Sequence, residues 1–237
     1  MTVIKQEDFI ASVAGALQYI SYYHPVDYIV SLAKAYEREQ SPAAKDAMAQ
    51  ILINSRMCFE GHRPICQDTG IVNAFVKLGM DVHFEAAPGE KPLDMQEMVD
   101  AGVRRAYLDP DNKLRASLQA DPAGKRVNTK DNTPAVVNVE LVRGATVEVT
   151  VAAKGGGSEA KSKFAMLNPS DSVVEWVLKT VPTMGAGWCP PGMLGIGIGG
   201  TAEKAMVMAK ESLMDSIDIQ DIKIGRASCR ERVFGLV

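Results

Sequence analysis

Four consecutive side chains, at positions 66 to 69, carry groups that are suited to catalysis rather than to packing. Cys66 offers a thiol that can ligate a metal, and Asp68 offers a carboxylate that can give or take a proton. Gln67 and Thr69 add hydrogen-bonding groups, and Gly70 lets the backbone turn ahead of an apolar, strand-like run. The sequence therefore predicts a reactive turn at the start of a buried strand.

Three successive glycines, Gly155, Gly156 and Gly157, follow a segment of strong strand character. Such a run is often only a flexible loop, because glycine has the largest conformational freedom. Here Lys154 on one side and Lys161 on the other place positive charge beside unshielded backbone N–H groups, which together can hold an anion. We therefore expect the three glycines to bind part of an anionic substrate.

A second cysteine with unusual surroundings is Cys189, which precedes two prolines. Prolines set the backbone direction and keep this position out of regular secondary structure, as Pro64 does ahead of Cys66. A free cysteine is otherwise often a small buried hydrophobic residue. The polar side chains that follow Cys66 favour a functional role over that alternative.

The spacing of Cys58, His62 and Cys66 offers another interpretation, because it resembles half of a zinc site. It lacks a tightly spaced cysteine pair and a second pair of ligands, so we favour a core position for Cys58 and a loop position for His62. His24 and His83 have no cysteine or acidic neighbours arranged for catalysis. Both are predicted to lie at the surface or in an interface.

Gly195, Gly197 and Gly200 match the Gly-x-Gly-x-x-Gly pattern of dinucleotide-binding folds. In that fold a strand precedes the first glycine and the helix starts within the pattern, whereas prolines precede the glycines here. The nicotinamide interpretation therefore fails on context. The backbone N–H groups ahead of a helix that begins near Thr201 could still hold a carboxylate.

The bulk composition excludes several classes of function. The chain has 237 residues, 46% of them hydrophobic, which suffices for one large or two small domains with a real core. A net charge of −3 without a basic stripe argues against a nucleic-acid partner. No apolar run has the length of a membrane span, and acidic residues precede the apolar run 9–20, unlike in a signal peptide. We expect a cytoplasmic protein without a membrane partner.

The apolar pattern predicts an α+β fold, with an N-terminal helical segment packed on a mixed or antiparallel sheet with flanking helices. Arg143-Gly144-Ala145 suits a tight hairpin between two of the strands. Helices are expected at 9–20, from Pro25, at 42–57, at 94–108, from about 170, and at 201–213. Asp8 is expected as the N-cap of the first helix, Pro25 as the first residue of the second, and Thr201 as the cap of the last. Strands are expected at 71–79, 135–142, 146–152 and 194–198, and loops at 88–92 and 154–158.

The C-terminal residues depart from this organisation. From about Ile224 the sequence becomes basic and loses its periodicity. We interpret residues 1–223 as one domain and residues 224–237 as a non-native extension. Cys229 lies in that extension and is given no role.

Taken together, these segments resemble the N-terminal, catalytic-cluster half of the class I iron–sulfur fumarate hydratases. The Cys-Gln-Asp-Thr-Gly motif at Cys66 and the Lys-Gly-Gly-Gly-Ser motif at Lys154 form a specific pair. The alpha subunit of L(+)-tartrate dehydratase shares the first motif, whereas Lys154 and Ser158 look more similar to the fumarase pattern. The resemblance spans roughly residues 5–223 and rests on residues 64–70, 112–115, 126–129 and 153–158 and on the segment from Cys189 to Thr201.

The resemblance implies a [4Fe–4S] cluster held by three cysteines, with the fourth iron open to the substrate. Cys66 and Cys189 match two of these ligands, and the third lies, in the family, farther along the chain than this sequence extends. Asp68 is implied as the general acid and base. The implied substrate-binding residues are Gln67, Asp68, Thr69, Arg115, Gly155, Gly156 and Gly157.

The implied activity is the interconversion of fumarate and (S)-malate by reversible hydration, with L(+)-tartrate dehydration as the alternative. We expect a small dicarboxylate substrate, a homodimer, and a C-terminal (beta) domain or subunit that this chain lacks. Whether the chain is active without that part is left open. A cluster-free, non-catalytic fragment and a structural zinc-binding protein are the alternatives of another class.

Overall fold

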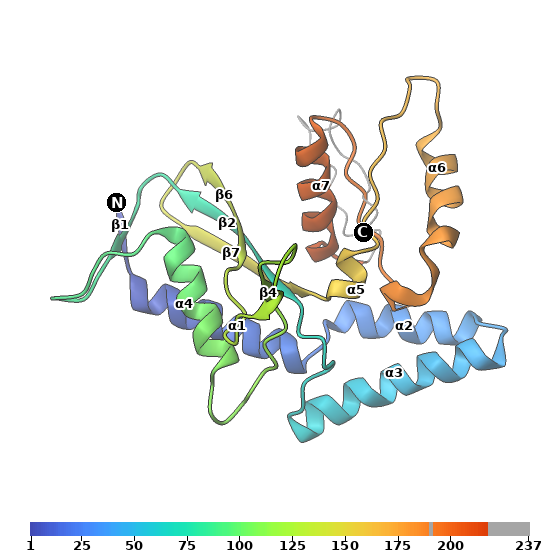
Figure 1. Cartoon of the computed structure of the whole chain (residues 1–237), viewed down its shortest axis with the longest axis horizontal. Helices are drawn as coiled ribbons and strands as arrows, with labels where there is room; N and C mark the ends of the chain where they lie inside the picture. Colours follow the sequence, from blue (N-terminus) through green and yellow to red (C-terminus); the bar gives the residue numbers. More distant parts are fainter. Residues whose placement is uncertain (190–191, 218–237) are drawn as a thin grey trace. The chain divides into compact units, whose positions relative to one another are not determined.

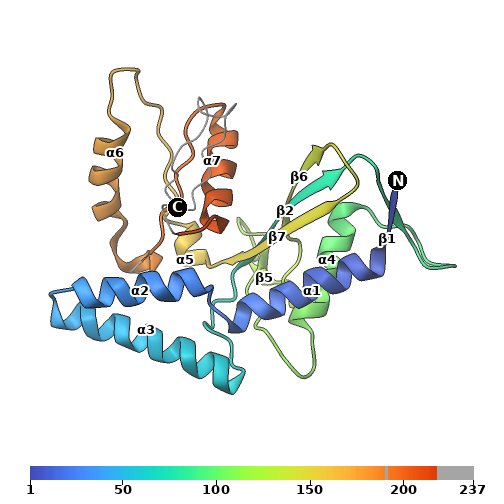
Figure 2. The same ribbon diagram turned by 180° about the vertical axis from the view of Figure 1, so that it is seen from behind.

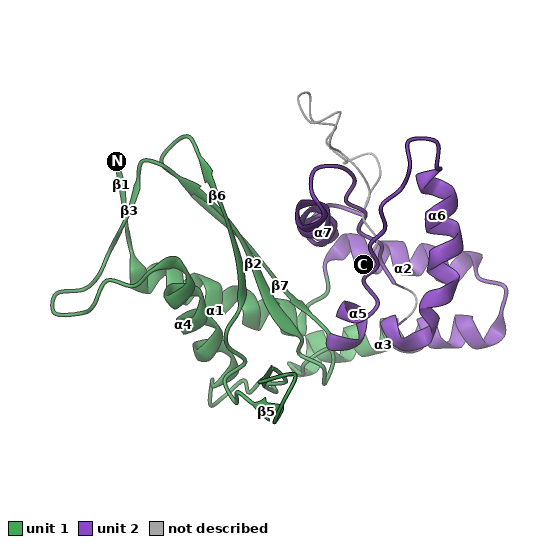
Figure 3. Ribbon diagram, turned by 45° about the horizontal axis from the view of Figure 1, so that its top comes forward, with its two compact units in different colours: residues 1–24, 51–155 green, residues 25–50, 156–237 purple. Residues whose placement is uncertain are grey.

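The computed structural model describes residues 1–189 and 192–217 and has an α+β fold, as the sequence predicts (Figures 1 and 2). The chain divides into two compact units, each built from two separate stretches of sequence (Figure 3). Unit 1 contains Met1–His24 and Ile51–Gly155, and unit 2 contains Pro25–Gln50 and the described residues from Gly156 onward. The predicted boundary at residue 224 lies outside the described residues.

A three-stranded mixed sheet forms the centre of unit 1 (Figure 1). β2 (Ile71–Gly79) lies in the middle, parallel to β6 (Val136–Val142) and antiparallel to β7 (Val147–Lys154). Valine is frequent in all three strands, and branched side chains favour extended backbone. β2 is apolar at most positions and buried along most of its length, which suits a central strand.

The predicted hairpin between β6 and β7 is wrong, although both strands exist. Each pairs with an opposite edge of β2, so β2 lies between them. The turn that joins them crosses the end of β2 instead, where the Asp81 N–H donates to the Gly144 carbonyl at 2.9 Å. The local turn residues were compatible with a hairpin, but placing β2 in the centre gives its buried backbone hydrogen-bond partners on both edges.

Helices α1 (Gln6–Tyr22) and α4 (Met95–Tyr107) pack on this sheet and form the core of unit 1 with it. α1 begins at Gln6, and its N-cap residue is Lys5, so the predicted N-cap Asp8 lies in the first turn instead. There its charge still interacts favourably with the helix dipole. Buried core residues include Phe9, Ile10, Val13 and Leu17 of α1, Met98, Val99 and Val103 of α4, and Val72 and Ala74 of β2.

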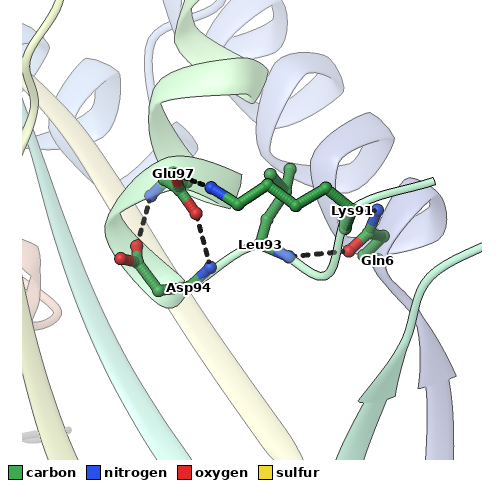
Figure 4. A network of polar contacts seen from close by, with 5 residues as sticks. All are labelled: Gln6, Lys91, Leu93, Asp94 and Glu97. Atoms are coloured by element: carbon green, nitrogen blue, oxygen red, sulfur yellow. Dashed lines mark hydrogen bonds and ion pairs between the residues drawn. The ribbon is translucent and has the colours of Figure 1, made fainter.

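The N-terminus of α4 is closed by a capping box (Figure 4). Asp94 Oδ1 accepts from the Glu97 N–H at 2.8 Å, and Glu97 Oε2 accepts from the Asp94 N–H at 3.0 Å. Lys91 forms an ion pair with Glu97 at 2.8 Å, and Gln6 Oε1 accepts from the Leu93 N–H at 3.2 Å. The helix predicted for this segment is confirmed, and the loop before it is tied to α1.

Two short strand pairs were not predicted. β1 (Thr2–Lys5) lies parallel to β3 (Val82–Glu85), and β4 (Gln119–Ala120) lies antiparallel to β5 (Val127–Asn128). Strands of two to four residues contain too little alternation to be recognised from the apolar pattern.

The first part of unit 2 is helical, as predicted. α2 (Val26–Arg38) begins one residue after Pro25, which is the N-cap rather than the first helical residue. α3 (Pro42–Gly61) begins at the predicted residue and runs past its predicted end at Met57. The helix starts in unit 2 and ends in unit 1.

The rest of unit 2 consists of short helical elements: α5 (Gly156–Glu159), α6 (Val173–Thr180), the 3₁₀ segment η1 (Val181–Trp188), α7 (Ala202–Glu211) and η2 (Ser212–Met214). The predicted loop at 154–158 is the end of β7 followed by one helical turn. The helix expected from about residue 170 begins at Val173, and the Ser172 hydroxyl caps it.

The strand predicted at 194–198 is wrong. The described residues there form only an isolated bridge at Ile196. The alternation of glycines with apolar residues imitates a strand, but glycine gives a strand no side chain to pack. α7 follows with Thr201 at its N-cap, as predicted, although the Thr201 side chain makes no capping hydrogen bond.

Candidate active site

The reactive turn at residues 66–70 lies between the end of α3 and the start of β2, within unit 1. Cys66, Gln67 and Asp68 are exposed, whereas Thr69 and Gly70 are buried. The Asp68 N–H donates to Cys66 Sγ at 3.4 Å, and the Gly70 N–H donates to Asp68 Oδ1 at 3.2 Å. The thiol and the carboxylate therefore lie on the accessible side of one compact turn, whose other side is anchored in the protein.

Asp68 lies directly beside the first of the three glycines. A Cβ atom placed on Gly155 would lie 2.9 Å from Asp68 Oδ2, which is closer than side chains tolerate. Glycine at this position therefore leaves the room that the carboxylate occupies. The fold brings Asp68 and Gly155 together, although more than eighty residues separate them in the sequence.

A pocket of about 170 Å³ opens beside the turn, and all its lining residues belong to unit 1. It is smaller than the roughly 300–1,000 Å³ of pockets that hold drug-sized ligands, so it suits a small molecule. Its lining combines Cys66, Asp68 and Thr69 of the turn with Pro64 and Ile65 before it, Ile20, Ser21 and His24 at and after the end of α1, and Ala153 of β7.

His24 is the member of this pocket that the sequence did not single out. Its ring is half-buried, and Nδ1 lies 3.0 Å from Ser55 Oγ. Burial lowers the pKa of His24 below its usual value, which favours the neutral imidazole. The sequence shows no cysteine or acidic neighbours arranged for catalysis around His24, whereas the fold places it in one pocket with Cys66 and Asp68. Nothing in the residues around His24 signals this.

Arg115 lies against the same turn. Its Nη1 donates to the Gln67 carbonyl at 3.3 Å, and the Thr69 hydroxyl donates to the Arg115 carbonyl. Arg115 is exposed, and a guanidinium has five N–H donors, so one bond to Gln67 leaves capacity for a carboxylate. The single proton of Thr69 is used within the protein, so in this conformation a substrate would meet its hydroxyl as an acceptor.

The remaining predicted residues form a second cluster, within unit 2. A Cβ atom on Gly157 would lie 2.6 Å from the Gly187 carbonyl oxygen, and Ser158 Oγ lies 3.5 Å from the Trp188 carbonyl oxygen. The glycine segment thus packs against the residues directly before Cys189. Cys189 itself is exposed and has a left-handed backbone conformation, with φ 60°.

The predicted site residues are therefore brought together in two groups. Unit 1 holds Cys66, Gln67, Asp68, Thr69, Arg115 and Gly155, and unit 2 holds Gly156, Gly157 and Cys189. A ligand role for Cys189 alongside Cys66 stays a prediction.

The zinc interpretation of Cys58, His62 and Cys66 is not supported. Cys58 is 3% exposed, as expected for a core residue. His62 stacks on the Tyr22 ring with centroids 4.0 Å apart, and its Nε2 lies 2.7 Å from Asn112 Oδ1. Within residues 1–189 and 192–217, no three His, Cys, Asp or Glu side chains form a group that could hold a metal ion.

Two further observations concern His83 and the apolar character of the helices. His83 on β3 is exposed, as predicted. In the part of the chain that the structure describes, no helix combines the length and the apolar character that crossing a bilayer requires.

Comparison with known proteins shows to which family this chain belongs. The chain is 32% identical over 200 residues to the protein named "Putative L(+)-tartrate dehydratase subunit alpha" from Methanocaldococcus jannaschii. The matched region covers 82% of this chain and 68% of that protein. The chain is 27% identical over 210 residues to the L(+)-tartrate dehydratase subunit alpha of Escherichia coli O157:H7, covering 86% and 66%. The match thus spans about two thirds of these relatives. The family model described as "Fumarate hydratase (Fumerase)" matches residues 10–234, and the chain therefore belongs to the fumarate hydratase family.

Proposed function

We propose that this chain is the alpha region of an iron–sulfur hydro-lyase that interconverts fumarate and (S)-malate by reversible hydration. Family membership and the two relatives support the hydro-lyase class. The observation that carries the proposal is the pocket of unit 1, where the Cys66 thiol and the Asp68 carboxylate belong to one exposed turn beside Gly155.

The chemistry of the two exposed thiols fits a [4Fe–4S] cluster. Thiolate sulfurs are the usual ligands of such clusters, and both Cys66 and Cys189 are exposed in turns. Cys58 differs, since burial raises the pKa of its thiol and disfavours the thiolate. We propose Cys66 and Cys189 as two ligands, with the third cysteine supplied from outside this chain. When bound, the cluster would supply a Lewis acid that polarises the substrate hydroxyl.

Asp68 is proposed to exchange the proton of the hydroxyl group that leaves or adds. Dehydration requires a proton on the departing hydroxyl and a separate base for the proton that leaves the neighbouring carbon, and hydration reverses both transfers. The Gly70 N–H holds Oδ1, while Oδ2 lies on the side of Gly155. The carboxylate is thereby oriented within the turn next to the proposed ligand Cys66.

The two carboxylates of the substrate need separate anchors. Arg115 is proposed to hold one of them by paired hydrogen bonds, which a lysine could not reproduce. The backbone N–H groups of Gly155, Gly156 and Gly157 are proposed to hold the other, in the manner of an anion-binding nest. Gln67 would donate to a substrate oxygen from the turn, and the Thr69 hydroxyl would accept a hydrogen bond from a substrate hydroxyl.

His24 adds a polar side chain to the wall of the same pocket. Burial lowers the pKa of His24 and favours its neutral ring. A neutral ring does not compete with Arg115 for a substrate carboxylate. We propose that His24 forms a hydrogen bond with a substrate oxygen, with Ser55 holding the orientation of its ring.

Dehydration of L(+)-tartrate is the second candidate, favoured by the names of the relatives. The fumarate assignment rests on the family description and on Lys154 and Ser158 around the glycines. Malate and tartrate differ by one hydroxyl group, so the two activities demand nearly the same site. Initial rates with malate and with L(+)-tartrate, measured on one preparation of the complete enzyme, decide between them.

A partner subunit or domain is part of the proposal. Both relatives are named as alpha subunits, which implies a further subunit in those enzymes. We propose that this chain likewise works with a beta part that supplies further substrate contacts, and that the alpha regions form a homodimer. Co-expression with the beta part, followed by size-exclusion chromatography with light scattering, tests both statements.

Anaerobic reconstitution of the complete enzyme with iron and sulfide tests the function directly. We expect visible absorbance typical of an Fe–S cluster and hydration of fumarate, both of which depend on Cys66. A complete enzyme that binds no iron, or that binds iron and converts neither malate nor tartrate, would show that the proposal is wrong.

A further inference from the structure

Two successive carbonyl groups of the reactive turn point into the protein and are held there by buried side chains. The first is the Thr69 carbonyl, which accepts from the Tyr107 hydroxyl at 2.8 Å. Tyr107 is the last residue of α4 and is 3% exposed. Burial raises the pKa of Tyr107 to about 12, so the phenol keeps its proton and remains a donor at neutral pH.

The second is the Gly70 carbonyl, which accepts from Asn132 Nδ2 at 2.9 Å. Asn132 is 1% exposed and has a left-handed backbone conformation, with φ 62°, which asparagine adopts more readily than most residues. Its Oδ1 accepts from the Ser117 N–H at 2.9 Å and from the Leu118 N–H at 3.0 Å. Tyr107 and Asn132 thus hold adjacent carbonyl groups of the same turn from two different segments of the chain.

The turn itself has no regular secondary structure, so its geometry depends on such contacts. A buried carbonyl without a donor is costly, and two adjacent ones that are both satisfied leave the backbone little freedom to rotate. The same turn exposes Cys66 and Asp68 and buries Thr69 and Gly70. Buried bonds at one end of the turn thus determine where the reactive groups at the other end point.

We infer that Tyr107 and Asn132 are positioning residues that hold the Thr69 and Gly70 carbonyls so that Cys66 and Asp68 line the pocket. Neither residue lines the pocket. The inference deepens the proposed function, and it relies on that function only for the kinetic part of its test.

Amide hydrogen exchange on the full chain provides the first test. The Asp68 and Gly70 amides are hydrogen-bonded inside the turn and report its opening. Tyr107→Phe is expected to speed their exchange roughly tenfold, the effect of losing one buried hydrogen bond, with little change in β2. Tyr22→Phe is the matched control, because Tyr22 is 2% exposed in the same unit. Unchanged exchange in the turn, or an equal increase in β2 or in the control, would overturn the inference.

Asn132→Asp is the second variant. It keeps the acceptor for the amides of Ser117 and Leu118 and a residue type that tolerates the left-handed backbone. The introduced carboxyl has no amide donor, and in its ionised form it has no proton at all to donate to the Gly70 carbonyl. We expect faster exchange at Gly70 and unchanged exchange at Ser117 and Leu118, whereas a uniform increase at all three would assign Asn132 a general structural role.

Kinetics of the reconstituted, complete enzyme give the last readout. Tyr107→Phe is expected to lower kcat roughly tenfold with KM changed less than about twofold, because a misplaced turn affects the reacting groups more than the carboxylate anchors. A rise in KM with unchanged kcat would contradict the positioning role. If the wild-type enzyme shows no hydro-lyase activity, the proposed function fails, and the exchange data still decide the inference.

Discussion

The two units differ in how far their own packing supports their part of the candidate site. In unit 1 the reactive turn lies at the start of a central strand, above a core of buried side chains from two helices and a sheet. In the described part of unit 2, the buried apolar side chains are Leu32, Met48, Met184 and Ala209. α6 buries none of its residues, and its Val174 and Leu178 are each 67% exposed.

This difference indicates that the two groups of site residues are held in place by different kinds of contact. The turn of Cys66 and Asp68 is fixed by hydrogen bonds with Tyr107 of α4, with Arg115 and with the buried Asn132, so its geometry exists before any ligand binds. The segment of Gly157 and Cys189 lies on one-turn and 3₁₀ helices with fewer buried neighbours. Elements of that kind open locally at low cost in free energy.

Removing one thiol from each unit is the strongest test of this comparison. Cys66→Ala and Cys189→Ala are each expected to abolish cluster binding by the complete enzyme, because each removes a proposed ligand. Iron and sulfide content after anaerobic reconstitution measures the effect. Cys58→Ala is the control and is expected to keep its iron. If Cys189→Ala also keeps its iron, Cys189 is not a ligand and this part of unit 2 does not hold the metal.

Replacing Asp68 tests the chemistry of unit 1 separately from its metal binding. Asp68→Asn is expected to lower kcat about 10²–10⁴-fold, the usual range for losing a general acid or base. The iron content should remain that of the wild type. Asp81→Asn, at an exposed position, is the control. An equal loss of iron and activity in Asp68→Asn would point to a role in holding the cluster.

Core substitutions test whether the two units differ in stability as their packing indicates. Leu17→Ala, at a position 1% exposed, should lower the free energy of unfolding by about 2–5 kcal/mol. Leu178→Ala should change it by less than about 0.5 kcal/mol. Urea unfolding followed by circular dichroism measures both. A large effect of Leu178→Ala would show that the α6 face is covered in solution.

The buried phenol of Tyr107 predicts a pH dependence of unit 1. Its pKa is raised from 10.0 to about 12, chiefly by burial, so the unfolded chain loses this proton first. The contribution to stability is therefore complete below pH 10 and is lost as the pH rises toward about 12, by up to about 3 kcal/mol. Tyr107→Phe should flatten this part of the curve in urea unfolding at several pH values. Tyr19→Phe, at a position 63% exposed, should not.

Local sequence patterns were sufficient where the structure itself is local. The helix at 94–108 was predicted because its apolar pattern is contained within one segment of the sequence. β2 was predicted with correct ends, since most of its residues are apolar and they lie in one segment of the sequence. The hairpin of β6 and β7 was wrong because a third strand competes for the same edges, which a window around Gly144 does not contain. The pocket position of His24 was missed because Cys66 and Asp68, which line the same pocket, are distant from it in the sequence.

The sequence by itself determined which reactive groups exist, where the main strands and helices run, and to which family the motifs are similar. Only the tertiary structure decided that Asp68 lies beside Gly155, that His24 shares the pocket of Cys66, and that Tyr107 and Asn132 hold the reactive turn. The physical reason is that strand order and burial result from competition among distant segments for the same partners. Hydrogen bonds between residues far apart in the chain form only after that competition is settled.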